Sequence, residues 1–187
     1  TTGSSNTFIG DQAMQGNTVG GSNVSIGVNS GLYSEGDGGD ESVFIGSATG
    51  FCNDASYQVM IGGNAGRYQE TGPNITAVGY NANRGSDGNT TGYYNTSIGS
   101  CANYAITTGG STVAVGWKAN ASSTTASYTT AVGTCALYSN TTGTGNLAIG
   151  FCSLYASVTS NNNVAVGDEA IRNNTTGASN VALGAHA

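Results

Sequence analysis

The chain has 187 residues, of which 31 are Gly, 24 Thr, 21 Ser and 21 Asn, so four residue types make up more than half of it. Leu, Ile, Val and Phe together number only 31, fewer than a compact globular domain normally buries. The net charge is −6, and no basic cluster can neutralise a run of phosphates, which excludes nucleic acid as a partner. Because the apolar stretches are only a few residues long, we expect no membrane insertion.

The apolar residues recur at a fixed spacing along the chain. An aliphatic residue followed by Gly occurs eleven times, and most steps between successive glycines are 17 residues. The pairs are Ile9-Gly10, Ile26-Gly27, Ile45-Gly46, Ile61-Gly62, Val78-Gly79, Ile98-Gly99, Val115-Gly116, Val132-Gly133, Ile149-Gly150, Val166-Gly167 and Leu183-Gly184. Two longer steps, of 19 and 20 residues, are interpreted as loop insertions. So short a period is typical of one coil of a solenoid.

Each copy is predicted to contain one short strand that ends at its Gly. In the clearest copies, 163–167 and 180–184, aliphatic residues alternate with Ala, which is the period of a strand. We expect the aliphatic residues to line the interior of each coil. The Ala side, also apolar, would then face outward and need another surface to cover it. After the Gly, a second segment and a polar turn such as 140–143 return the chain to the next strand.

The sequence therefore predicts an all-β fold, a parallel β-roll or β-solenoid of about eleven 17-residue coils. Residues 1–187 are interpreted as one segment of a longer fibre. Stacked coils repeat every ~4.8 Å, which makes a rod roughly 50 Å long. An Asn recurs three residues before the last aliphatic residue in several copies, and we expect these amides to form hydrogen-bonded ladders between coils.

The Asn-Val-Ala-Val-Gly core at 163–167 resembles the head repeats of trimeric autotransporter adhesins of the YadA type. The longer pattern at 133–150 is similar to repeat arrays in bacteriophage tail fibres. Both resemblances imply an extracellular fibre, on a virion or a cell surface, and the adhesins imply a parallel β-roll assembled as a homotrimer. The adhesin repeat is shorter than this one, so the coil here has extra residues. A single wider solenoid whose second face closes on its own return strand is the alternative to a trimer.

The cysteines favour two interpretations. Cys135 and Cys152 occupy the same place in adjacent coils, so stacking brings their Cα atoms to about 4.8 Å, within disulfide range. Cys101 lies two coils from Cys135, which is too far. The alternative interpretation is that all four cysteines are small buried apolar residues.

Three groups of residues are candidates for modification or binding. Among eight Asn-x-Ser/Thr sequences, the turn positions Asn89, Asn140 and Asn174 are the best candidates for glycosylation. Asp37, Asp40 and Glu41 concentrate carboxylates in an inserted loop that is either a Ca²⁺ site or a solvated acidic turn. The sugar-stacking candidates, for which packing between coils or chains is the alternative, are Tyr80, Trp117, Phe151, Tyr93 and Tyr94.

No enzyme chemistry is indicated. The single His, His186, is isolated, and neither a paired acid nor a nucleophile with a base is present. No cofactor is expected. Three functional hypotheses follow: a structural shaft segment of an extracellular fibre, a receptor- or glycan-binding adhesin segment, and a filament coated with glycan. The even spread of the repeat over the chain favours the shaft.

Overall fold

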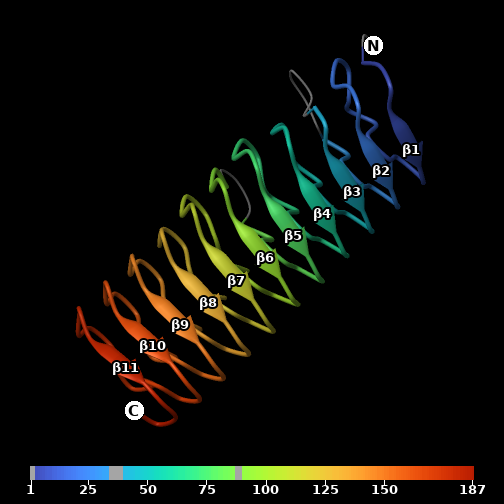
Figure 1. Cartoon of the computed structure of the whole chain (residues 1–187). Coiled ribbons are helices and arrows are strands. Elements are labelled where there is room, and N and C mark those ends of the chain that lie inside the picture. Colours follow the sequence, from blue (N-terminus) through green and yellow to red (C-terminus); the bar gives the residue numbers. More distant parts are fainter. Residues whose placement is uncertain (1–2, 34–39, 87–89) are drawn as a thin grey trace.

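A computed structural model describes residues 3–33, 40–86 and 90–187. Every regular element in these ranges is a strand of three residues, and the eleven strands form one parallel sheet in chain order (Figure 1). The strands are β1 (Thr7–Ile9), β2 (Val24–Ile26), β3 (Val43–Ile45), β4 (Val59–Ile61), β5 (Thr76–Val78), β6 (Thr96–Ile98), β7 (Val113–Val115), β8 (Thr130–Val132), β9 (Leu147–Ile149), β10 (Val164–Val166) and β11 (Val181–Leu183). The predicted β-solenoid is confirmed.

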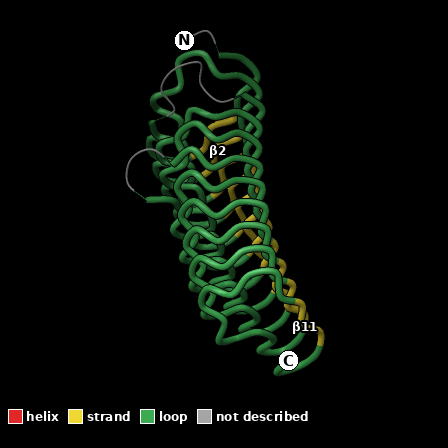
Figure 2. Tube along the Cα trace, turned by 90° about the vertical axis from the view of Figure 1, so that its left-hand side faces the viewer, coloured by secondary structure: helices red, strands yellow, loops and turns green. Residues whose placement is uncertain are grey.

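Equivalent residues of successive coils lie directly above one another. Ala165 of β10 pairs with Ala148 of β9 on one side and Ala182 of β11 on the other. The two long steps do not disturb this register, because β2 pairs with β3 and β5 with β6 at equivalent residues. Both insertions are thus accommodated outside the sheet. Figure 2 shows the result, a narrow column of coils with the strands along one side.

The return segments are also hydrogen-bonded from coil to coil. Cys135 N donates to Trp117 O of the previous coil at 2.9 Å, and Leu137 N donates to Ser153 O of the next coil at 3.0 Å. The N–H groups of the return segment thus point alternately to the previous and to the next coil. For this, the second and fourth residues after each repeat Gly adopt positive φ, 56° at Cys135 and 53° at Leu137. Left-handed backbone is therefore not confined to the Gly and Asn corners that the sequence suggests.

The prediction of which strand face lies inside is wrong. The central residues, such as Ala77, Ala114 and Ala131, are fully buried, whereas the aliphatic residues on either side point outward and Ile98 is 41% exposed. The reason is the width of the coil. A three-residue strand packs directly against its own return segment, and where that segment already places Leu137 or Leu154 inside, the strand side has room only for a small residue such as Ala.

The two bulky strand residues that are buried, Phe44 and Met60, face return segments that have glycine at the opposing position. Phe44 and Met60 are buried at the central strand position, and six residues later their coils have Gly50 and Gly66. A Cβ on Gly50 would lie 2.5 Å from the Phe44 ring. Where the strand has Ala131, the same return position has a fully buried residue, Leu137. In these three coils the interior is therefore filled once, from the strand at Phe44 and Met60 and from the return segment at Leu137.

The expected asparagine ladder is present. Asn163 N donates to Asn146 Oδ1 at 2.9 Å, and Asn180 N and Nδ2 donate to Asn163 Oδ1 at 2.9 and 3.0 Å. A second, internal ladder was not predicted: Asn120 Nδ2 donates to Asn103 Oδ1 at 2.8 Å inside the middle coils. Because these amides satisfy one another, the middle of the core can be polar without an energetic penalty.

Candidate functional site

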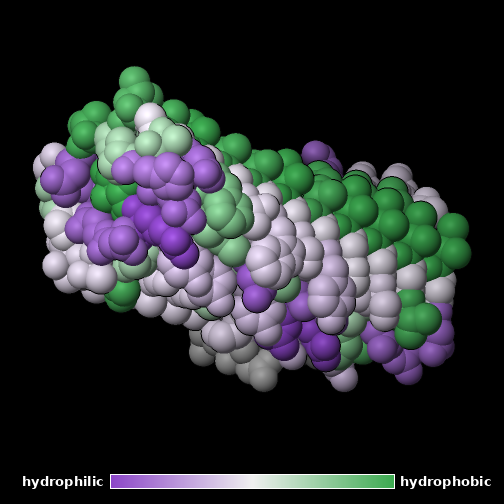
Figure 3. Space-filling model, turned by 90° about the horizontal axis from the view of Figure 1, so that it is seen from below, coloured by the Kyte–Doolittle hydropathy of each residue, from purple (hydrophilic) through white to green (hydrophobic). Residues whose placement is uncertain are grey.

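An apolar surface, here called the aliphatic face, runs along the outside of the sheet. It consists of the first and third residues of all eleven strands, which point away from the coil interior. Figure 3 shows a continuous hydrophobic band along the length of the molecule. The large apolar residues of the face that are most exposed to solvent are Ile9, Val59, Ile61, Ile98, Val113, Ile149, Val181 and Leu183. A band of this length is a candidate protein interface.

The structure brings three of the five predicted sugar-stacking residues into one column. Tyr80, Trp117 and Phe151 each follow a repeat Gly, lie on every second coil and are about half exposed. The intervening coils have small residues there, Ser100 and Thr134. Tyr93 and Tyr94 do not join this column. They form an edge-to-face pair with centroids 5.4 Å apart that precedes β6, whereas the column follows the strands.

A second set of aromatic residues, missed from the sequence, alternates with cations on the return segments. We call this set the cation–aromatic column. Arg84, for example, lies over two rings, with its Cζ 4.7 Å from the centroid of Tyr68 and 5.3 Å from that of Tyr104. It contains all four Lys and Arg residues of the chain. Its members are Phe51, Arg67, Tyr68, Arg84, Tyr104, Lys118, Tyr138, Tyr155 and Arg172. The sequence does contain a signal for this column, because Tyr104, Tyr138 and Tyr155 are separated by multiples of 17 residues, with position 121 falling between the first two.

One coil interrupts this column. The fifth residue after the repeat Gly is aromatic or Arg in every coil from Phe51 to Arg172 except at Ala121. A hollow of about 480 Å³ lies there, bordered by Tyr104, Tyr138, Lys118 and Ser122, with Asn81 also in its wall. The outer surface thus has a slot between two tyrosines.

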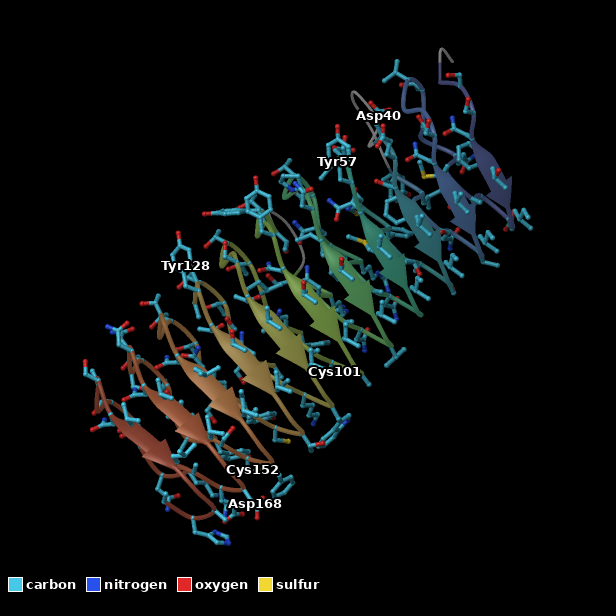
Figure 4. The ribbon with its side chains drawn as sticks, in the orientation of Figure 1. Asp40, Tyr57, Cys101, Tyr128, Cys152 and Asp168 are labelled. Atoms are coloured by element: carbon cyan, nitrogen blue, oxygen red, sulfur yellow. The ribbon has the colours of Figure 1, made fainter. Side chains whose placement is uncertain are left out.

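Cys135 and Cys152 lie in adjacent coils, as the register predicts, and both are free thiols; Cys152 is labelled in Figure 4. Burial raises the pKa of Cys135 above its ordinary value of 9.0, although the nearby Lys118 partly opposes this. Burial likewise raises the pKa of Cys152, and the neighbouring Cys135 adds to the effect. Both cysteines therefore fill space as protonated thiols at neutral pH.

The glycosylation candidates differ in accessibility. Asn140 is fully buried, with its Nδ2 donating to Gly143 O at 3.0 Å and its Oδ1 accepting from Gly143 N, so it cannot hold a glycan in the folded coil. The amide of Asn140 thus closes this turn from inside, and glycosylation at this position, which would require the turn to open, stays a prediction. Asn174 makes the same contacts but is partly exposed. Asn89 lies outside the described residues.

The acidic loop is only partly described. Asp37 lies outside the described residues, Glu41 is exposed, and Asp40 Oδ1 accepts a hydrogen bond from Gly21 N at 2.7 Å. Asp40 thus has a structural contact between two coils. Across residues 3–33, 40–86 and 90–187, no three His, Cys, Asp or Glu side chains gather closely enough to hold a metal ion.

Within the described ranges, no helix has the length and apolar character needed to cross a membrane. No protein-family model, curated protein or solved structure matches the chain. The surfaces described above are therefore the basis for assigning a function.

Proposed function

We propose that this chain is a non-catalytic structural segment of an extracellular fibre, of the tail-fibre or surface-adhesin kind, and that it assembles as a homotrimer. The observation that carries the proposal is the aliphatic face. A rod that is open to solvent along one continuous apolar side is stabilised when copies of itself cover that side.

The geometry of the face suits copies aligned side by side. Its two columns of Val, Ile, Leu and Thr rise at the coil repeat of about 4.8 Å, so an identical parallel chain offers matching columns at every coil. Three copies around a common axis parallel to the rods would bury all three faces in one core. The resemblance to trimeric adhesin heads favours three copies over two.

The sequence pattern predicts that the Ala side of each strand faces outward and needs another surface to cover it. Since Ala lies inside the coil, the proposed trimer uses the branched residues instead, and these bury more apolar area for each coil than Ala would. The fibre function and extracellular location rest on this elongated repeat architecture and on the resemblance. The buried amide of Asn140 weakens the alternative of a glycan-coated filament.

Sedimentation equilibrium tests the assembly. The expected mass is three times the 18.5 kDa of one chain. Val113→Lys, which places a charge in the aliphatic face, should dissociate the trimer, whereas Thr125→Lys, at an exposed turn position, should leave it intact. A wild-type protein that sediments as a single chain would refute the proposal.

A further inference from the structure

We propose that the slot at Ala121 binds one pyranose ring of a carboxylated polysaccharide. This inference concerns the outer surface of the return segments and does not depend on the trimer, which would cover the strands. The ring would insert between Tyr104 and Tyr138, and its carboxylate would pair with Lys118.

The spacing of the slot suits one inserted ring. Tyr104 and Tyr138 are two coils apart, which is about 9.6 Å at the coil repeat. A guest ring halfway between them would lie about 4.8 Å from each, near the 5.2 Å that separates the stacked rings of Tyr138 and Tyr155. The guest would replace the aromatic side chain that position 121 lacks. Axial hydrogens make a pyranose thicker than an aromatic ring, so it fills this gap better.

The two walls are held in place from outside the slot. Tyr155 stacks on Tyr138 with only 6° between the ring planes. On the other side, Arg84 lies over Tyr104, and its Nη1 is 3.3 Å from the Tyr104 hydroxyl. Because both rings are already supported by the column, the slot is formed before a ligand arrives, which lowers the entropic cost of binding.

Charge selects an acidic sugar. The chain has a net charge of −6, yet all four of its cations lie in the cation–aromatic column. In the described part of the chain, no carboxylate lies within ion-pair distance of Lys118, and its Nζ instead lies 4.6 Å from the Trp117 ring centroid. Lys118 is therefore available to a ligand carboxylate, a charge-assisted contact.

The polar groups around the slot match sugar hydroxyls. Ser122 and Asn81 line the hollow together with the tyrosines. Asn81 Oδ1 is buried in this wall and has no hydrogen-bond partner among the described residues, so a hydroxyl that reaches it would satisfy an orphaned acceptor. Aromatic walls with a few polar groups and one charge are typical of small-ligand sites.

Trigalacturonic acid, with neutral galactotriose as its matched control, is a suitable probe. Trp117 is the only Trp of the chain and contacts Lys118, so its fluorescence should report binding. We expect saturable binding of the acidic trisaccharide and much weaker binding of the neutral one. Lys118→Gln should weaken binding of the acid by about tenfold or more, the usual size of a lost charge-assisted hydrogen bond. Calorimetry checks the affinities independently of fluorescence.

Ala121→Tyr is the sharpest variant. It fills the slot with the ring that the same position has in neighbouring coils, so it should keep the fold and abolish binding. Ser47→Tyr adds an exposed ring in a distant coil and should bind normally. If Ala121→Tyr does not fold, Tyr138→Ala removes one wall and should also weaken binding. Absence of saturable binding to wild type, unchanged binding in the slot variants, or equal affinity for galactotriose would overturn the proposal.

Discussion

At the scale of single residues, two positions six residues apart share the interior of several coils. Phe44 and Met60 are each followed by a glycine at that distance, whereas Ala131 is followed by Leu137. Since a close-packed interior tolerates neither a void nor an extra side chain, the two positions act as one volume.

Exchanging the two members of such a pair tests this coupling. Phe44→Ala should lower the free energy of unfolding by about 3 kcal/mol or more, because it leaves a cavity. Gly50→Leu alone should also destabilise, since its side chain would collide with the Phe44 ring. The double variant Phe44→Ala/Gly50→Leu reproduces the arrangement of Ala131 and Leu137, and should be more stable than either single variant. Urea unfolding measures all four proteins, and additive losses would contradict the coupling.

The paired thiols of Cys135 and Cys152 predict a loss of stability in alkali. Both pKa values are raised by folding, so above pH 9.0 the unfolded chain releases protons that the folded chain retains. The free energy of unfolding should therefore fall as the pH rises above 9.0. Urea unfolding under reducing conditions at pH 8 and pH 10 measures this fall, which should be smaller in Cys135→Ala/Cys152→Ala. Equal slopes in the two proteins would show that other groups cause it.

At the scale of one element, the strand ends where the repeat Gly packs against the Gly of the next coil. Gly62 has φ of 128°, and a Cβ there would lie 2.6 Å from the Gly79 carbonyl oxygen. Its neighbour Gly63 is unlike it, since a Cβ at that position would meet only the edge of Tyr80 at 3.5 Å. The repeat Gly is thus required both by its backbone conformation and by the stacking distance.

These two neighbouring glycines form a matched pair for mutation. Gly62→Ala should cost about 2–3 kcal/mol in the free energy of unfolding, because it adds backbone strain and a clash with main-chain atoms. Gly63→Ala should change that energy by less than about 0.5 kcal/mol. Thermal and urea unfolding measure both variants. Similar losses in the two would indicate that flexibility, and not packing between coils, explains the repeat Gly.

Much of the architecture was predictable from the sequence because the coil repeat is a property of spacing. The period, the strand at each Gly, the insertions and the asparagine ladder all follow from it. Which face of each strand points into the coil was not predictable from the spacing. Both faces are apolar, and only the width of the coil decides that Ala114 lies inside and Val113 outside. The slot at Ala121 depends on one missing ring, which is visible only once the column around it is built.

At the scale of the whole molecule, the proposed assembly through the aliphatic face predicts that stability depends on neighbouring copies. A rod with one uncovered apolar side is expected to gain part of its stability from neighbouring chains. Thermal unfolding should therefore shift to higher temperature as the protein concentration rises. The shift should disappear in Val113→Lys, which separates the chains but leaves each coil interior unchanged. Unfolding that is independent of concentration in the wild type would mean that each chain is stable alone.

The alternation of bulky and small residues after the repeat Gly bears on how such chains align. Columns of similar aliphatic side chains look almost the same after a displacement by one coil, so on their own they would let neighbouring rods slide along the axis. Tyr80, Trp117 and Phe151, separated by Ser100 and Thr134, make the border of the face repeat every two coils instead. In register, the rings of neighbouring rods lie at the same height and so do the small residues, whereas a slip of a single coil would place each ring beside a small residue. In the proposed assembly, these aromatic residues would thus fix the position of each chain along the common axis.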